Sequence, residues 1–451
     1  MGRAVVDDAP LTLEAMTGHL ALGCKPASAW RVGAEHEKFL FRMGTLEPIP
    51  YEDHGVRALL EGLRRFGWED VREGATLIAL QRGGANVSLE PGGQFELSGA
   101  PLETIHDIYE ETVQHLAECK AVGQELGIGF LGLGFIPTWT RAEVPVMPKG
   151  RYKIMRGYMP KVGGLGLDMM FRTCTVQANL DFASEADMVA KFRTSLALQP
   201  IATALFANSP FTEGKPNGFL SGRANVWTDT DPDRTGMLDF VFADGFDFER
   251  YARYALDVPM YFVKREGRYI DVAGQSFRAF AAGELEALPG DRAGLKDWED
   301  HLSTIFPEVR LKQYLEMRGA DVGPLDRLAA LPALWTGVLY DGAALAAAWD
   351  LCKGWTAADR AGLRADVARI GLKAKVAGRS AQDVARDLLA IAREGLKARR
   401  RGREGMADEA GYLNPLDEIA DSGITPAERL LELFHGSWGG EVRNAFDDFA
   451  Y

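Results

Sequence analysis

The sequence predicts an α+β protein with one domain spanning residues 1–451. Strand-like and helix-like segments mix throughout the chain without the strict alternation of βαβ units. No internal repeat, low-complexity tract or long linker divides it. With 47% hydrophobic and 25% charged residues, the composition is that of a globular protein with a sizeable core.

Hydrophobic alternation locates the strands of this fold, because successive side chains of a strand point to opposite faces. The first expected strand covers residues 31–41. The other expected strands cover residues 76–81, 86–90, 94–97, 171–181, 258–264 and 269–273.

Helices are expected at residues 12–22, 56–66 and 102–126, with Gly127 ending the third, and after residue 327 the chain is mostly helical. Ser184 and Asp187 form a capping-box pattern at the start of a further helix. The segment Thr425-Pro426-Ala427-Glu428 repeats that pattern with proline at the first helical position.

Charge and cysteine content exclude several protein classes. A net charge of −13 argues against non-specific nucleic-acid binding, and the basic run 397–403 is expected to complement a helix C-terminus. Four widely separated cysteines form no CxxC motif, which is typical of a reduced protein without a zinc site. The N-terminus lacks a signal-peptide pattern, and the longest apolar run, 126–137, is too short to cross a bilayer. We therefore predict a cytoplasmic protein without membrane or nucleic-acid partners.

Carboxylates and amides gather on the polar faces of three expected strands. Glu35 and Glu37 share one face because they are two residues apart, whereas His36 points the other way and is expected to be structural. The second segment carries Asn86, Ser88 and Glu90, then Gln94 and Glu96 after a Pro-Gly-Gly turn. The third has polar residues at odd positions, namely Thr173, Thr175, Gln177, Asn179 and Asp181.

These faces indicate a cation site. Two carboxylates about 4 Å apart repel by roughly 4 kcal/mol at an effective dielectric constant near 20, so Glu35, Glu37 and Glu96 converge only if protons or cations relieve the repulsion. Oxygen ligands favour Mg²⁺ or Mn²⁺ over zinc. A P-loop is absent, since Gly214-Lys215 is followed by proline.

Candidate cationic partners lie later in the chain. The Gly-rich stretch around residues 148–160 contains Lys149, Arg151, Lys153 and Arg156. Arg172 begins the expected strand 171–181, and Arg223 follows a loop of Pro, Gly and Asn. Glu316 and Arg318 are two residues apart, which places a carboxylate beside a phosphate-binding guanidinium.

Longer motifs give the sequence a family resemblance. GAEHEKF, SLEPGGQFELSGAPLETIHD, MPKGRYKIMRGYMPKVG, GLDMMFRTCTVQANLDF, ALFANSPFTEGKPNGFLSGR, WTDTDPDRTGML and FPEVRLKQYLEMRGAD closely resemble the glutamate–cysteine ligases of plants and related proteobacteria. The resemblance extends over residues 23–451. It implies the glutamine-synthetase-like fold of carboxylate–amine ligases, in which an antiparallel sheet curls into a funnel with helices outside. It also implies phosphorylation of the glutamate γ-carboxylate by ATP, followed by attack of the cysteine amine.

The resemblance implies site roles as well. Arg318 would stabilise the transferred phosphoryl group, with Lys149 and Arg151 beside the ATP phosphates. Arg223 and Arg172 would hold substrate carboxylates, with Tyr158, Met170 and Trp227 as pocket walls. The expected metal ligands for Mg²⁺ or Mn²⁺ are Glu35, Glu37, Glu90, Glu96, Gln177 and Glu316. Glutathione is an expected feedback inhibitor, and the protein is expected to be a monomer or homodimer.

One departure from the plant members is informative. The resemblance implies two regulatory disulfides in the plant members. The corresponding positions here are occupied by Tyr109, Val272, Ala287 and Ala329, so no redox control is expected. Three alternatives stay open at this point: a γ-glutamyl ligase with another amine acceptor, a guanidino kinase of the same fold, and a non-enzymatic binding module.

Overall fold

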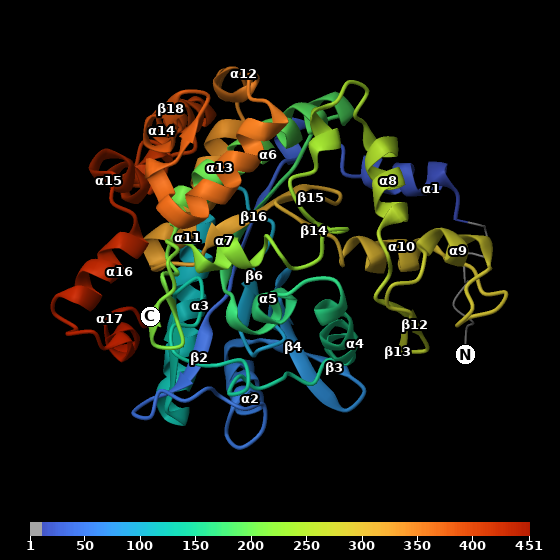
Figure 1. Ribbon diagram of the computed structural model, residues 1–451, viewed down its shortest axis with the longest axis horizontal. Coiled ribbons are helices and arrows are strands. Elements are labelled where there is room, and N and C mark those ends of the chain that lie inside the picture. Colours follow the sequence, from blue (N-terminus) through green and yellow to red (C-terminus); the bar gives the residue numbers. More distant parts are fainter. Residues whose placement is uncertain (1–10) are drawn as a thin grey trace.

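An eight-stranded antiparallel sheet forms the centre of the computed structural model, which describes residues 11–451 (Figure 1). The strand order is β15-β16-β8-β1-β6-β5-β4-β3, so neighbouring strands come from distant parts of the chain. The strands are β1 (Val32–His36), β3 (Glu69–Glu73), β4 (Thr76–Arg82), β5 (Ala85–Leu89), β6 (Phe95–Ser98), β8 (Thr175–Leu180), β15 (Val309–Leu311) and β16 (Leu315–Asp321).

One face of this sheet is apolar and covered by helices. Val32 and Ala34 of β1 and Val176, Ala178 and Leu180 of β8 are buried on it. The long helices α3 (Ile105–Leu126), α6 (Glu185–Phe206) and α11 (Leu325–Leu339) pack on β1, β8 and β16, and α14 (Ala381–Arg399) packs on α11. The predicted α+β architecture, with helices around an antiparallel sheet, is confirmed.

The other elements lie around this core. The C-terminal helices gather on one side of the molecule, and α8 to α10 lie on the opposite side with the hairpin of β12 and β13 (Figure 1). The remaining helices are α1 (Leu13–Ala21), α2 (Val56–Leu63), α4 (Gly150–Tyr158), α5 (Gly166–Arg172), α7 (Gly222–Val226), α8 (Phe248–Asp257), α9 (Phe277–Ala282), α10 (Leu295–Leu302), α12 (Gly342–Cys352), α13 (Ala357–Ile370), α15 (Asn414–Ser422), α16 (Pro426–His435) and α17 (Ala445–Asp448). The short strand pairs are β2 (Phe39–Arg42) with β7 (Ile128–Leu131), β9 (Phe211–Thr212) with β10 (Lys215–Pro216), β11 (Thr235–Gly236) with β14 (Phe306–Pro307), β12 (Phe262–Arg265) with β13 (Arg268–Asp271), and β17 (Lys375–Val376) with β18 (Arg379–Ser380).

Helix ends follow the signals in the sequence. Thr104 and Asp107 form a capping box at the start of α3, and Gly127 ends that helix in the left-handed conformation with φ of 67°. Thr425 and Glu428 form the predicted capping box of α16. No single helix among residues 11–451 has the length and apolarity to cross a membrane, although the bent pair α11 and α12 passes that test jointly on length and composition.

Two predicted elements are wrong, and one segment without a predicted element is a helix. The expected strand 31–41 is two strands in different sheets, because the chain leaves its partners β6 and β8 after Lys38 and pairs with β7. In the expected strand 171–181, Arg172 instead ends helix α5, and β8 starts at Thr175. The Gly-rich stretch at 150–158 forms helix α4, with its glycines at the first position and in the last turn.

The basic run at the end of α14 is tied to the protein by ion pairs. Arg399 pairs with Glu409 at 2.5 Å, Arg401 pairs with Glu103 at 2.6 Å, and Arg403 pairs with Glu110. These pairs join the helix C-terminus to α3 and to the segment that follows α14.

The contact between α11 and α14 yields a stability prediction. A Cβ at Gly337 would lie 2.2 Å from the backbone oxygen of Ala392, so Gly337→Ala must push the helices apart. We expect it to lower the free energy of unfolding by about 1–3 kcal/mol. Gly362→Ala in α13 is the control, because an added Cβ there would meet no atom within 4 Å outside the helix's own backbone. It should raise the free energy of unfolding by up to about 1 kcal/mol. Urea-denaturation midpoints measure both, and equal effects of the two changes would contradict the tight helix contact.

Candidate active site

The polar face of the sheet brings carboxylates from distant strands together. Glu35 on β1 lies opposite Gln177 on β8 and Ser98 on β6. Glu316 on β16 lies opposite Asn179 on β8. The expected strand faces are therefore correct for these residues, and the strand order makes them neighbours.

Glu35 and Glu37 are held close to other carboxylates. Glu35 accepts hydrogen bonds from Gln177 Nε2 at 3.1 Å and Asn179 Nδ2 at 2.7 Å. Burial, and then the nearby charges of Glu316 and Glu96, raise the pKa of Glu35 to about 7. Burial, followed by Glu96 and Glu90, likewise raises the pKa of Glu37 well above its usual range. A bound cation would relieve this excess of negative charge.

A second carboxylate pair lies at the end of β5 and on β6. Glu96 accepts a hydrogen bond from Ser88 Oγ at 2.9 Å, and burial, then the charge of Glu90, raise its pKa. Lys149 lies close enough to interact with both carboxylates, although burial lowers the pKa of its ammonium to about 8. Arg151 also lies near Glu90, so this corner combines two acids with two cations.

Glu316 has a different environment because cations surround it. Arg310 donates to both of its oxygens, with Nη2 at 2.8 Å from Oε1, and Arg318 Nη1 lies 3.1 Å from Oε1. Burial alone would raise the pKa of Glu316, but Arg310, Lys312 and Arg318 outweigh it and lower the pKa. Sequence reasoning missed Arg310 and Lys312, although their spacing of two residues was the signal that identified Glu35 and Glu37.

A recess of about 80 Å³ lies beside these residues, between the sheet, α4, α5 and α7. The predicted site residues that line it are Glu37, Glu90, Arg151, Met170, Arg223, Trp227 and Arg318. Lining residues that sequence reasoning did not select include Gln94, Tyr152, Met155, Met169 and Phe306.

Several polar atoms around the recess lack a partner. Arg223 Nη2 donates to the backbone oxygen of Arg318 at 2.8 Å, and Arg318 Nη1 donates to Gln177 Oε1 at 2.7 Å. Arg151 Nε, Arg223 Nε and Trp227 Nε1 are buried without a hydrogen-bond partner among residues 11–451. Buried donors of this kind are costly unless a ligand completes them. The recess therefore presents unsatisfied donors, two of them on guanidinium groups.

Two predicted site residues lie elsewhere. Arg172 donates to Asp168 at 2.8 Å and to Glu213 at 2.7 Å, so its guanidinium is already paired and does not line the recess. The expected substrate-binding role of Arg172 is therefore not supported. Tyr158 lines a separate cleft of about 710 Å³ on the other side of α4, together with Lys153 and Arg268.

His36 lies on the opposite face of the sheet from Glu35. It is buried with Lys38, whose Nζ lies 3.0 Å from His36 Nδ1, and its ring packs edge-on against His115. Burial, and then the charge of Lys38, hold the pKa of His36 well below its usual value. The imidazole therefore belongs to the core and does not reach the recess.

The donor set fits a magnesium ion that substrate helps to hold. Within residues 11–451, no three carboxylate, imidazole or thiol groups form a ready-made metal cluster. Magnesium commonly takes one or two protein carboxylates and completes its octahedron with water and substrate phosphate oxygens. The oxygen of Asn179 that lacks a partner adds a neutral donor beside Glu35.

The raised pKa of Glu35 has a measurable consequence. Without metal or substrate, this carboxyl binds its proton more tightly in the folded state, at a pKa of about 7, than at its usual value of 4.5. Its contribution to stability is complete below about pH 4.5 and is lost as the pH rises through about 7. Glu35→Gln should therefore raise Tm relative to wild type in EDTA at about pH 8, and much less at about pH 5. Glu61→Gln on the exposed face of α2 is the control, and a pH-independent difference for Glu35→Gln would contradict the assignment.

Sequence comparison places this site in a known family. The model of glutamate-cysteine ligase family 2 matches residues 31–448. The chain is 59% identical to a chloroplastic glutamate–cysteine ligase of Nicotiana tabacum over 449 residues, covering 99% of this chain and 84% of the relative. It is 58% identical to the chloroplastic enzyme of Arabidopsis thaliana with the same coverage. A chloroplastic glutamate–cysteine ligase B of Oryza sativa is 56% identical over 443 residues, 98% of this chain and 88% of the relative.

These comparisons overturn one prediction and confirm another. The prediction of a cytoplasmic location is wrong, since these relatives are all named as chloroplastic enzymes. The predicted carboxylate–amine ligase fold is confirmed. A solved glutamate–cysteine ligase of Francisella tularensis in complex with AMP superposes with a TM-score of 0.53 at 13% identity, covering 93% of this chain and 89% of that one. The chain belongs to glutamate-cysteine ligase family 2.

Proposed function

We propose that this chain is an ATP-dependent glutamate–cysteine ligase that catalyses the first step of glutathione biosynthesis. The observation that carries the proposal is the recess beside the polar sheet face, where crowded carboxylates adjoin unpartnered donors of Arg151, Arg223 and Trp227. The carboxylates suit the metal ion that accompanies a nucleotide. The unpartnered donors suit the phosphates and the carboxylate of an amino acid. Family membership supplies the identity of the substrates.

The reaction proceeds in two steps. The γ-phosphoryl group of ATP passes to the glutamate γ-carboxylate, giving ADP and γ-glutamyl phosphate. The cysteine amine then attacks the acyl carbon, and the tetrahedral intermediate collapses to γ-glutamylcysteine and phosphate. Catalysis of such transfers resides mainly in positioning and in stabilising the developing charge. The protein therefore needs fixed cations at the phosphoryl group more than it needs a nucleophile.

The cations of the recess suit these tasks. Arg318, held by Gln177 and Glu316, is fixed for stabilising the transferred phosphoryl group. Arg223 projects from the first turn of α7 and has an unpartnered nitrogen for the glutamate carboxylate. Lys149 directly precedes α4, and Arg151 lies in its first turn. Both would contact the ATP phosphates.

Magnesium would be held on the same sheet face. The proposed ligands are Glu35, Glu37, Glu90, Glu96, Gln177 and Glu316, of which Glu316 is the least available because Arg310 occupies both of its oxygens. When bound, the metal would neutralise charge on the ATP oxygens. Burial, and then the charges of neighbouring carboxylates, raise the pKa of Glu35, Glu37 and Glu96, which supports this assignment.

The remaining walls suit a thiol. Met155, Met169 and Met170 bring polarizable thioethers to the recess, and Trp227 and Phe306 add aromatic surface. Glutathione contains both the γ-glutamyl and the cysteinyl group, so we propose that it competes for this recess. A single catalytic domain over residues 1–451 and a monomeric or homodimeric state stay predictions.

Phosphate release with single and paired substrates tests the function. We expect ADP and free phosphate to accumulate only when glutamate and cysteine are both present. Replacing cysteine by 2-aminobutyrate, its methyl analogue, should lower kcat/KM by less than about two orders of magnitude, because an apolar pocket discriminates such groups weakly. Serine should be poorer, since its hydroxyl loses more on desolvation. ADP without free phosphate would indicate a kinase, and turnover only with another amine would indicate a different acceptor.

Substitution of Glu37, which directly follows β1, and of His36, which ends β1 and faces the other way, tests the proposed metal ligands. Glu37→Gln should lower kcat by about 100-fold or more, because it removes charge at the recess itself. His36→Asn is the matched change on the opposite face. It should leave turnover nearly unchanged while lowering stability by about 1–3 kcal/mol, because Lys38 loses a buried partner. Circular dichroism and steady-state kinetics at saturating Mg²⁺ separate the two effects. If both variants fold and lose turnover equally, the assignment of Glu37 and His36 to opposite faces would be contradicted.

A further inference from the structure

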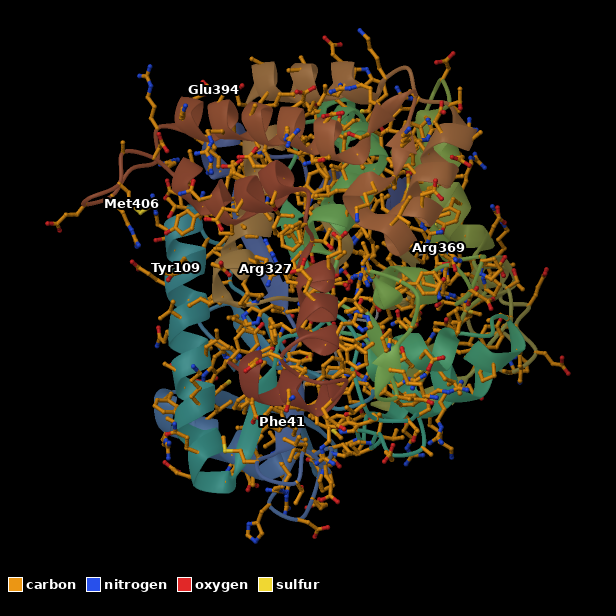
Figure 2. The ribbon with its side chains drawn as sticks, turned by 60° about the vertical axis from the view of Figure 1, so that its left-hand side comes forward. Phe41, Tyr109, Arg327, Arg369, Glu394 and Met406 are labelled. Atoms are coloured by element: carbon orange, nitrogen blue, oxygen red, sulfur yellow. The ribbon has the colours of Figure 1, made fainter. Side chains whose placement is uncertain are left out.

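Another pocket, separate from the recess and from the cleft of Tyr158, lies where the first turn of α11 meets α15, the start of α16 and the C-terminal segment. Its volume is about 300 Å³, at the lower end of the range for small-molecule sites. Ile419, Ile424 and Phe449 supply apolar walls, and Arg327 contributes a guanidinium. Figure 2 shows Arg327 between α3, marked by Tyr109, and the red C-terminal helices.

Arg327 is a largely buried cation that forms no salt bridge within residues 11–451, although Asp326 lies close enough to act on its charge. Only 9% of the residue is exposed, and its Nη1 is buried with no hydrogen-bond partner within residues 11–451. The arginines nearby behave differently, since Arg429 pairs with Glu432 at 3.0 Å and Arg393 pairs with Asp417. Burial lowers the pKa of Arg327 to about 10, so the group is still charged at neutral pH. An unpaired buried charge is costly, so an anion that enters the pocket would gain a partner that has already been desolvated.

The acids of the pocket restrict the charge of such a ligand. Asp326 and Glu418 also line it, and Asp326 Oδ1 accepts the backbone N–H of Arg327 at 2.9 Å instead of pairing with the guanidinium. A dianion would be repelled by these two carboxylates, whereas a single carboxylate matches the planar fork of one arginine. The apolar walls select an apolar body attached to that carboxylate.

We propose that this pocket is a second ligand site, which binds a small monocarboxylate with an apolar substituent through Arg327. The site is separate from the recess that holds the proposed substrates. It nevertheless adjoins the elements that build the recess, because Arg327 follows β16, the strand of Glu316 and Arg318, by way of the loop 322–324.

A hydrogen-bond network links the two regions. Asp321, at the end of β16, accepts hydrogen bonds from Ser209 Oγ at 2.6 Å and Ser221 Oγ at 2.8 Å. Ser221 caps α7, which carries Arg223. On the other side of the pocket, the N–H of Ala427 in α16 donates to the backbone oxygen of Ala207 at 2.9 Å, two residues before Ser209. The pocket is therefore bordered by segments that lead directly to the residues positioning Arg223.

Calorimetric titration of the full chain with 4-methylpentanoate tests the proposal. We expect saturable binding that persists in saturating glutamate and that neither the neutral 4-methylpentanamide nor inorganic phosphate reproduces. Arg327→Met should weaken binding by about tenfold or more, because a charged hydrogen-bonding partner is lost. Arg429→Gln, a change at the exposed rim, should retain it.

Each other outcome overturns the proposal. Absence of binding or equal binding by Arg327→Met would show that Arg327 does not hold a carboxylate in this pocket. Competition by glutamate would show that 4-methylpentanoate occupies the substrate recess instead. Equal binding of phosphate would show that the apolar walls do not select the ligand. Arg327→Met should fold with an unchanged or higher Tm, because it removes an uncompensated buried charge. If it fails to fold, the comparison of 4-methylpentanoate with its amide on the wild-type chain still decides the role of charge.

Discussion

The burial of several carboxylates together on one face of the sheet is the constraint on which the rest of the site depends. Burial, and then the charges of neighbouring carboxylates, raise the pKa of Glu35, Glu37 and Glu96. Such an arrangement persists in a folded protein only when the surrounding structure over-determines it. Here the backbone ladder of β1, β6 and β8 fixes the strands, and the buried apolar face on the other side anchors them. The core thus stabilises a polar surface that would not assemble by itself.

The balance of charge is uneven across that face. At the β15–β16 edge, Arg310 and Lys312 oversupply positive charge and keep Glu316 ionised. Toward β5 and β6, Lys149 lies near Glu90 and Glu96, Arg151 lies near Glu90, and burial lowers the pKa of Lys149. Acids and guanidinium groups therefore meet at the recess, which Glu37 and Glu90 line together with Arg151, Arg223 and Arg318. Such a mixed lining suits an anionic group that arrives with its counter-ion.

The sequence predicted which way the site side chains point better than it predicted the helices and strands that carry them. The two-residue period of a strand correctly placed Glu35 and His36 on opposite faces. It also placed Gln177 and Asn179 on the same face. It failed at Arg172, where a few apolar residues satisfy the helical and the strand pattern equally. It also missed Arg310 and Lys312, whose role depends on β15 pairing with β16, and the recess itself, whose walls come from separate helices. Contacts of that kind depend on tertiary packing, which one sequence read alone does not specify.

The strand order also governs when the site forms during synthesis. Residue 35 reaches its neighbour at position 177 only after more than 140 further residues, and β16 completes the polar face at Asp321. Pairings between such distant segments form slowly, because the chain loses loop entropy before the contacts compensate it. Until α11 emerges, part of the apolar face of β1 and β8 stays uncovered on the nascent chain. A ribosome-bound intermediate of about 320 residues would expose aggregation-prone strands, so this enzyme is expected to need chaperone protection late in translation rather than early.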